Sequence, residues 1–483
     1  MRIEKNILHE NVHLFVLCLF SVGVVCSKFL MSLAIIIGVI NLISEAKFRE
    51  YYQNLKKNTF FAAVFLFFIL HIIGMLWSEN IDYGLNDIRR KLSIIAVPII
   101  LISKPILWRR DYNKILFCFI GALVITSLIN STNFFFLKGG EGYTDPREEL
   151  SLFNSHIRYA IMIAFGIPIL LEFNSASKNR KLVLILIAFW FLFYTYFSQV
   201  LTGIISLLAI FFAYSIYQLI AKNKTRFVWI LFVFIFSGIG SIYFVLSADY
   251  DKVDAAEIHF VSMKKEWIKK SRMPFDGLDQ RKQELKYTLS RFLQSKNLSC
   301  DGQGVSDLSE SEIKAVESGK ANVSEMNIGF WGRIEGLRFQ IHHSNDPNGH
   351  SLLQRIEAWK AGLEICKENL LIGVGTGDVD DSFKAKYKEN DSKLKGKNQI
   401  RAHNTYLTVL LTFGPIGLLL FIYLIFAHVK IQFQSKQIMG FVFMCVMIVT
   451  FLFEDTLETQ TGITLFSFFG ALYSIPIPIN KND

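Results

Sequence analysis

Residues 401–427 read RAHNTYLTVLLTFGPIGLLLFIYLIFA, a polar start followed by a nearly unbroken apolar run. The run from 404 to 427 is long enough for a helix to cross the roughly 30 Å hydrocarbon core of a bilayer. A hydrophilic stretch, residues 248–403, comes directly before it. His403 and Arg401 therefore stand where a helix meets the membrane surface, which is where the charged part of a lipid-linked anion would lie. We expect a candidate active site at this surface.

The composition is that of a membrane protein. Of 483 residues, 52% are hydrophobic, 45 are Phe and only 19% are charged, whereas soluble domains carry about 25% charged residues. The sequence therefore predicts an all-α polytopic membrane protein with about 12 transmembrane helices. The predicted spans are residues 12–26, 29–43, 59–77, 92–108, 113–137, 152–173, 182–200, 201–219, 227–247, 404–427, 437–453 and 460–475.

Two of these boundaries depend on short polar breaks. Ser27-Lys28 separates the first two spans, which form either a tight helical hairpin or one interrupted element. The apolar stretch 182–219 is too long for one span, so we expect it to divide near Ser198–Thr202.

The distribution of Lys and Arg predicts the orientation. With a cytoplasmic N-terminus, most of these residues outside 248–403 fall in cytoplasmic loops, as the positive-inside rule requires. We expect an N-terminal transmembrane bundle of about nine spans (1–247), a large periplasmic helical subdomain (248–403) and a C-terminal transmembrane segment of about three spans (404–483). The protein would then lie in a bacterial inner membrane, with its site facing the periplasm. The net charge of +10 belongs mainly to cytoplasmic loops, so no clustered basic face favours nucleic-acid binding.

The outer stretch has helical patterns of its own. Residues 258–298 predict an amphipathic helix lying on the membrane or on the bundle. Ser309–Ser318 and 352–369 predict two further helices, and the second places Arg355 and Trp359 on one face because they are four residues apart. Cys300 and Cys366 lie in this oxidising compartment and could form one disulfide, although nothing local enforces the pairing.

Four ordered motifs in residues 350–430 carry a family resemblance, and weaker matches occur at Ser155–Arg158, Phe197–Gly203 and Glu454–Gly462. The chain resembles the O-antigen ligase and O-antigen polymerase family of bacterial envelope glycosyltransferases. It departs from the family at Asn369-Leu370, where Asn-Pro is common, and in a longer loop before Arg355. The four motifs are Arg355-x-x-x-Trp359, Asn369-Leu370-Leu371-Ile372-Gly373-Val374-Gly375-Thr376-Gly377, His403-Asn404-Thr405-Tyr406-Leu407 and Phe413-Gly414-Pro415-Ile416-Gly417.

The resemblance implies a GT-C-like helical bundle and an inverting transfer that needs neither metal nor cofactor. A glycan would pass from undecaprenyl pyrophosphate to an acceptor hydroxyl at the outer face of the inner membrane. We favour a ligase that joins polymer to lipid A core. A polymerase that joins repeat units and a protein O-oligosaccharyltransferase are alternatives within the class. A transporter or flippase of lipid-linked sugar is the alternative from another class, but its halves should show repeat symmetry, which the sequence lacks.

The resemblance and the chemistry together assign the two catalytic residues. Arg355 would stabilise the charge that develops on the leaving pyrophosphate, although an Arg on a helix is by default a solvated cation. His403 would be the general base, since the positive end of the following helix favours a neutral imidazole. An interfacial His is otherwise a hydrogen-bonded anchor. Asn404 would cap the helix or orient the imidazole.

The remaining candidates would bind substrate. Arg158 lies about two turns into its predicted span, where it is costly unless it binds an anion or pairs with a carboxylate. In a short outer loop, Arg89 and Arg90, with Lys91, would hold lipid pyrophosphate or simply snorkel to the interface.

Glu454 and Asp455 would orient His403 or an Arg, or be solvated at a helix end. Arg401 and Trp359 complete the predicted site.

Other patterns are weaker. Gly373-x-Gly375-x-Gly377 predicts a tight turn rather than a nucleotide loop, because no strand precedes it. Asp378, Asp380 and Asp381 are oxygen ligands that suit a divalent cation, but we predict no metal. His342, His343 and His350 lack metal-ligand spacing and are expected on a loop surface.

Overall fold

The computed structural model describes residues 2–106, 108–137, 146–173, 177–222, 258–280, 283–326 and 350–476, with a few residues between these ranges. Within them every regular element is a helix and no strand occurs, which confirms the all-α prediction. Seven of the described helices are long and apolar enough to cross a membrane. Their apolar spans are Asn6–Cys26, Lys28–Glu45, Thr59–Trp77, Arg109–Phe136, Lys178–Phe197, Leu201–Ala221 and Thr405–Ser435.

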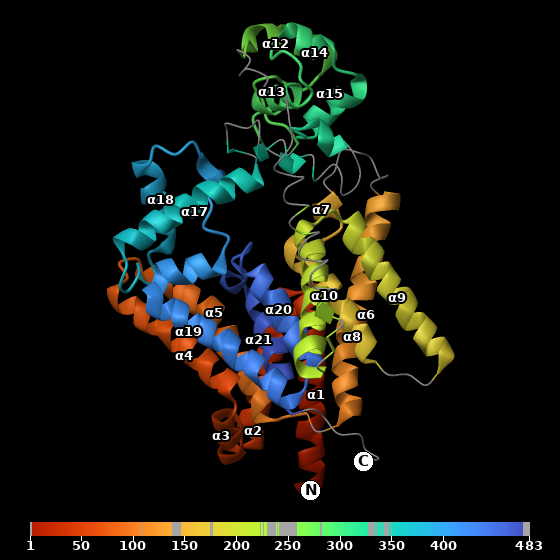
Figure 1. Cartoon of the computed structure of the whole chain (residues 1–483), viewed down its shortest axis with the longest axis vertical. Coiled ribbons are helices and arrows are strands. Elements are labelled where there is room, and N and C mark those ends of the chain that lie inside the picture. The colour runs from red at the N-terminus through yellow and green to blue at the C-terminus, as the bar shows by residue number, and fades with distance from the viewer. Residues whose placement is uncertain are drawn as a thin grey trace.

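The N-terminal half is a helical bundle (Figure 1). The 3₁₀ turn η1 (Gly74–Trp77) extends α4, and the π turn η2 (Asn133–Leu137) extends α6. The α-helices are α1 (Arg2–Cys26), α2 (Lys28–Glu45), α3 (Phe48–Lys57), α4 (Thr59–Ile73), α5 (Ile81–Ser103), α6 (Arg109–Thr132), α7 (Pro146–Glu149), α8 (His156–Glu172), α9 (Lys178–Phe197) and α10 (Leu201–Lys222).

The second half supplies the helices outside and at the end of the bundle. The short 3₁₀ turns are η3 (Val323–Met326), η4 (Gly396–Asn398) and η5 (Thr456–Glu458). The α-helices are α12 (Phe260–Lys270), α13 (Leu285–Ser295), α14 (Gly302–Ser306), α15 (Glu310–Glu317), α17 (Ser351–Glu368), α18 (Val379–Glu389), α19 (Thr405–Ser435), α20 (Ile438–Thr450) and α21 (Gln460–Ser474).

The predicted spans can now be compared with these helices. Both predicted breaks are confirmed: α1 and α2 meet at Ser27, and α9 and α10 are separated by residues 198–200. Four more predicted spans coincide with α5, α8, α20 and α21, which do not meet the length and hydropathy of the seven spans. Predicted span 227–247 lies almost entirely outside the described residues. The count of about 12 therefore stays a prediction.

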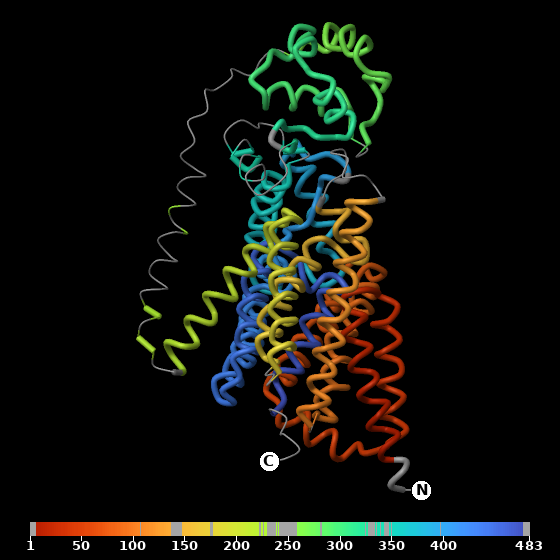
Figure 2. The backbone as a smooth tube through the Cα atoms, turned by 90° about the vertical axis from the view of Figure 1, so that its right-hand side faces the viewer, coloured from red at the N-terminus to blue at the C-terminus, as the bar shows by residue number. Residues whose placement is uncertain are grey.

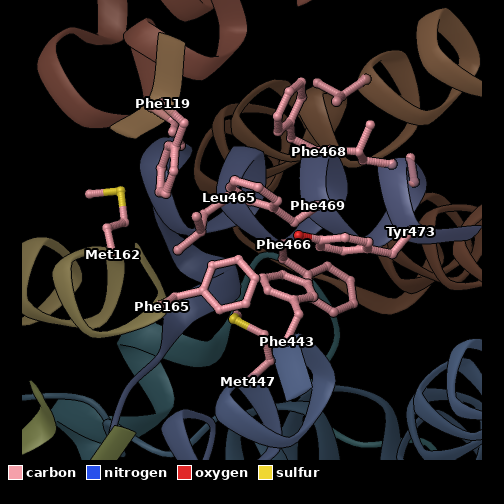
Figure 3. Packing of buried hydrophobic residues seen from close by; sticks show 14 of the residues in the cluster. Phe119, Met162, Phe165, Phe443, Met447, Leu465, Phe466, Phe468, Phe469 and Tyr473 are labelled. Carbon is pink, nitrogen blue, oxygen red and sulfur yellow. The ribbon is translucent and has the colours of Figure 1, made fainter. Parts of the chain in front are cut away.

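Helix α21 is the centre of the core. Every residue from Thr461 to Ser474 is buried, because α5, α20, α4 and α19 pack around it. Figure 3 shows its aromatic side chains against neighbouring helices: Phe469 lies 4.9 Å from Phe119 of α6, 5.2 Å from Phe165 of α8 and 5.6 Å from Phe443 of α20, between ring centroids. This packing explains how a 15-residue helix organises the bundle without facing lipid.

Helices α12–α15 form a separate small core at one end of the molecule. Trp267, Leu289, Phe292 and Val316 are fully buried within it. The single amphipathic helix predicted over 258–298 is wrong, because residues 271–284 separate α12 from α13 and the two helices bury their apolar faces in this core rather than on the bundle. The two other predicted outer helices are confirmed as α15 and α17.

Figures 1 and 2 place α12–α15 beyond α17 and α18, at the end of the bundle far from the start of α1. We call this the capped end. Helices α17 and α18 bury Ala361 and Phe383 together with Leu407 and Leu411 of α19. Cys300 lies in the α12–α15 core and Cys366 beside the α17 core, and both are free thiols, so the considered disulfide is absent.

A kink in α19 joins the capped end to the bundle. Gly414 has φ +66°, a left-handed conformation that glycine adopts without strain, and Pro415 has no N–H to donate. The carbonyls of Leu411 and Thr412 accept instead from the N–H groups of Val374 and Gly375, at 2.9 Å each. The loop between α17 and α18 is thus bonded into α19.

Candidate active site

The site is built on the turn that follows α20. We call Glu454–Glu458 the acidic turn, because it carries Glu454, Asp455 and Glu458. It binds the beginning of α19 at several points: Asp455 accepts from the His403 N–H at 3.0 Å and from the Thr408 hydroxyl at 2.6 Å. The Thr405 hydroxyl donates to the Glu454 carbonyl at 2.7 Å. These bonds fix residues 403–408 against the acidic turn.

The backbone at His403 is unusual. Its φ is +45°, a left-handed conformation that is uncommon for a residue with a side chain and that clusters at functional sites. Asn404, the next residue, caps α19 by accepting from the Leu407 N–H at 3.0 Å, as predicted. The Trp359 indole N–H donates to the Ala402 carbonyl at 2.7 Å, so α17 holds the residue before His403.

Four side chains from different parts of the chain then meet, and we call them the His403 cluster: His403, Glu454, Arg158 and Arg355. Glu454 lies at the centre, with 5% of its side chain exposed. Its carboxylate is 3.7 Å from His403 Nδ1, 3.9 Å from Arg158 Nη2 and 3.8 Å from Arg355 Nη2. The imidazole is 36% exposed, which leaves its other nitrogen, Nε2, as the one to meet a substrate.

Among these four side chains positive charge exceeds negative charge, and the neighbouring Asp455 carboxylate also attracts both guanidiniums. Burial lowers the pKa of Arg355 even though Glu454 opposes the shift, but a guanidinium stays protonated in proteins. Burial would raise the pKa of Glu454, yet neighbouring His403, Arg158 and Arg355 hold it below its ordinary value. Among the described residues, no group hydrogen-bonds to Nε of Arg158 or Arg355, although both atoms are buried. Two partly buried guanidiniums facing one carboxylate suit an additional anion.

A second set of charges lies beside the first, and we call it the Lys91 network: Asp87, Lys91, Glu458 and Arg401. Lys91 Nζ donates to Asp87 at 2.5 Å and to Glu458 at 2.9 Å. The other oxygen of Glu458 lies 3.3 Å from Arg401, which also donates to the Tyr83 hydroxyl at 2.9 Å. Burial would raise the pKa of Glu458, but Lys91 and Arg401 lower it to about 2. Every charge in this network therefore has a partner.

The chain also matches a known family. The O-antigen ligase family model covers residues 183–422, from α9 to the middle of α19. The chain belongs to the O-antigen ligase family. Among curated proteins, none matches it.

Members of the O-antigen ligase family are glycosyltransferase-like enzymes, and the function of this chain is of the O-antigen ligase or polymerase type. Its partners are accordingly a lipid-linked glycan donor and a glycan or lipid acceptor. The matched region contains Arg355 and His403, whereas Arg158 and Glu454 lie outside it. The fold brings residues from inside and outside the family match into one cluster.

Four of the residues predicted for the site of this family member are therefore brought together. The prediction for Arg158 needs one correction: it is the third residue of α8, in the first turn rather than two turns into a span, because α8 begins only at His156. The alternative that Glu454 and Asp455 are solvated at a helix end is wrong, since the two residues are only 4% and 7% exposed. Glu454 instead faces both predicted guanidiniums and His403.

The other predicted residues occupy different positions. Arg89 and Arg90 are not in a short loop, because α5 begins at Ile81 and includes them. Arg89 is exposed, and Arg90 lies 3.5 Å from Asp87 and over the Tyr83 ring. Arg401 belongs to the Lys91 network, and Trp359 and Asn404 support the backbone on either side of His403.

The sequence analysis missed Asp87 and Glu458. Asp87 and Lys91 are four residues apart within one helix, a spacing at which opposite charges pair. That spacing was the available signal for the Lys91 network. Nothing local connects Lys91 with Glu458, because the two are separated by 367 residues.

The glycine motif forms the predicted tight turn. Gly373 and Gly375 have φ of +69° and +90°, and a Cβ on Gly375 would lie 2.5 Å from Ser78 Oγ. Asp378 caps the chain before α5 by accepting from the N–H groups of Glu79 and Asn80 at 2.8 Å each. Among the residues described, no group of three or more His, Cys, Asp or Glu could hold a metal ion.

One prediction for the other histidines is wrong. His350 was expected on a loop surface but is only 5% exposed, because it stands at the N-terminal boundary of α17. His342 and His343 lie outside the described residues.

Proposed function

We propose that the protein is an O-antigen ligase. It transfers a glycan from undecaprenyl pyrophosphate to a hydroxyl of the lipid A core, at the periplasmic face of the bacterial inner membrane. The single observation that carries the proposal is the His403 cluster, in which a partly exposed imidazole lies beside two partly buried guanidiniums that share one carboxylate. A protein that only translocated the lipid-linked sugar would need no such imidazole.

The guanidiniums suit the donor. Arg158 and Arg355 approach from α8 and α17, so their planar forks converge from two sides on the space beside Glu454. As the bond between sugar and pyrophosphate breaks, negative charge builds on the phosphate oxygens, and bidentate bonds from Arg strengthen with that charge. The arginines thus stabilise the leaving group without a metal.

His403 suits the acceptor. Its Nδ1 lies 3.7 Å from Glu454, whose charge favours the imidazolium that forms when Nε2 accepts the proton of the acceptor hydroxyl. The acceptor oxygen attacks the anomeric carbon from the side opposite the phosphate. The bond from that carbon to the phosphate oxygen breaks, and its electron pair leaves with undecaprenyl pyrophosphate. This single displacement inverts the anomeric configuration.

Deletion of the gene in its own bacterium tests the acceptor. For a ligase, surface polysaccharide attached to lipid A core disappears completely, while lipid-linked polymer accumulates. Core carrying single repeat units would instead identify a polymerase, and unchanged lipid A core with unglycosylated protein would identify a protein O-oligosaccharyltransferase. Polysaccharide electrophoresis with an antibody to the core distinguishes these patterns.

The proposed orientation has its own test. Gln303, on α14 of the capped end, and Lys57, at the end of α3, are both exposed. In a variant without the six native cysteines, Gln303→Cys reacts with a membrane-impermeant thiol reagent in cells with a permeabilised outer membrane, and Lys57→Cys reacts only after lysis. The opposite labelling pattern would place the His403 cluster on the cytoplasmic face and rule out the proposed donor side.

A further inference from the structure

Lys91 is a buried lysine whose ammonium has two carboxylate partners, Asp87 and Glu458. Only 3% of the residue is exposed, and its ammonium contacts Asp87 on its own helix and Glu458 of the acidic turn. A charge in such a place is costly unless it is paired. The pairing joins α5 to the segment that carries Glu454 and Asp455.

The network leads from Lys91 to His403 by two routes. In the first, Glu458 holds Arg401, which is two residues before His403. In the second, Glu458 belongs to the same turn as Asp455, whose carboxylate accepts from the His403 N–H, and Glu454, which faces the imidazole. A movement of Glu458 therefore acts on both the backbone and the ring of His403.

The Lys91 network leaves no place for an anion. Its charges are matched, with Lys91 and Arg401 against Asp87 and Glu458. The cavity lined by these residues has a volume of about 10 Å³, which is room for about one water molecule. A phosphate cannot enter, so Lys91 and Arg401 act on the protein rather than on the donor.

We propose that Lys91, acting through Glu458, is a positioning residue that holds the strained backbone of His403 in the geometry for proton transfer. This inference rests on the proposed function, because it assumes that His403 is the general base. A misplacement of about 1 Å at a reacting group can cost on the order of 10²-fold in rate. Loss of Lys91 accordingly lowers kcat while the donor, bound by Arg158 and Arg355, keeps its KM.

Two variants test the proposal with purified full-length protein in detergent, a lipid-linked glycan donor and a core acceptor. Lys91→Met removes the charge, and the double variant Asp87→Leu/Lys91→Met removes the pair together. Replacement of a complete buried ion pair by apolar side chains generally preserves folding, and Glu458 keeps Arg401 in the double variant. In both, kcat falls at least about tenfold and KM for the donor stays unchanged.

The pair of Lys104 and Glu45 provides a matched control. Lys104 is the C-cap residue of α5 and contacts Glu45, the last residue of α2, at 2.9 Å. Asn54 of α3 donates to the neighbouring Ser103 carbonyl, and Figure 1 shows α3 at the end of the bundle opposite α12–α15. Lys104→Met breaks an ion pair between the C-cap of the same helix and α2 and lowers the melting temperature, but kcat is unchanged. A purely stabilising role for Lys91 would give this same result.

The possible outcomes separate the two proposals. Normal kcat in the Asp87→Leu/Lys91→Met variant, or a raised KM with normal kcat, overturns the positioning role of Lys91. If His403→Ala is inactive in the same assay, the proposed function survives that result. A fully active His403→Ala variant instead overturns the general base and with it the basis of the inference.

Discussion

The His403 cluster and the Lys91 network lie side by side and use the same kinds of side chain, yet their electrostatics differ. In the His403 cluster, one carboxylate faces two guanidiniums and an imidazole at 3.7–3.9 Å. In the Lys91 network, two carboxylates face two cations at 2.5–3.3 Å. The first set has spare positive charge and loose contacts, and the second is balanced and tightly bonded.

The difference suits the His403 cluster to binding an anion and the Lys91 network to holding the protein in place around it. When an anion displaces a long contact between two charges, little interaction energy is lost. Closely paired charges resist displacement, because each charge would be left buried without a partner. The acidic turn joins the two sets, since Glu454 belongs to one and Glu458 to the other. Substitutions and ligands that act on one set and not on the other test this contrast, and the largest effect is expected at His403.

His403→Ala should reduce glycan transfer by about 10²- to 10⁴-fold, because general-base catalysis is lost. His403→Gln should be equally inactive, since an amide can hydrogen-bond but cannot take a proton at neutral pH. Turnover of the lipid-linked donor by purified protein measures both. His9→Ala, at a histidine bonded to Asn41, is the control and should keep normal turnover. Largely active His403→Gln would show that the imidazole only positions the acceptor.

Arg158→Lys and Arg355→Lys should each lower turnover by about 10²-fold, nearly as much as substitution by Ala. A lysine keeps the charge but cannot form the planar bidentate contact with phosphate. Arg110, whose side chain is 75% exposed, provides the matched control in Arg110→Lys, which should behave as wild type. Full activity of Arg355→Lys would rule out a bidentate contact between Arg355 and the donor.

Inorganic pyrophosphate should raise the melting temperature of the wild-type protein by occupying the spare positive charge. A ligand at 100 times its Kd stabilises the folded state by about 2.7 kcal/mol. The Arg158→Ala/Arg355→Ala variant should show no such increase, and Lys91→Met should retain it. Thermal unfolding followed in detergent gives the result. Equal stabilisation of all three proteins would place pyrophosphate outside the His403 cluster.

Glu458→Gln should destabilise the protein at neutral pH, and the difference in stability from wild type should shrink in acid. The wild-type carboxyl has its pKa lowered from 4.5 to about 2, so its ionised form stabilises the fold above pH 4.5 and this contribution is lost as the pH falls toward 2. The variant lacks this dependence, which we expect to amount to on the order of 1 to 2 kcal/mol. Melting temperatures of both proteins between pH 6 and 3 measure it. Parallel curves would contradict a buried, ionised Glu458.

The sequence was informative where function depends on local pattern. Apolar length located the beginning of α19, and the spacing of Arg355 and Trp359 located one face of α17, because both properties are contained in a few consecutive residues. The glycine turn was predicted for the same reason. These elements correspond to the ordered motifs of the family.

The sequence was least informative where charges pair across the chain. Hydropathy placed the start of a span at residue 92, but α5 begins at Ile81 and includes two buried charges, because Lys91 pairs with both Asp87 and Glu458. Glu454 could be predicted only as one of two possibilities, since its partners Arg158 and Arg355 lie far from it in sequence. The internal core of α12–α15 was missed because its apolar residues also suit a membrane-surface helix.

The kink in α19 has a consequence for the length of the preceding chain. Because the carbonyls of Leu411 and Thr412, freed at the kink, accept from the N–H groups of Val374 and Gly375, the segment after α17 is tied directly to the helix that His403 precedes. The register between Arg355 and His403 is therefore set locally, downstream of α12–α15. Chain of different length can be inserted before α17 without altering the spacing of Arg355 and His403, so α12–α15 are free to differ in size while the His403 cluster beneath them keeps its geometry.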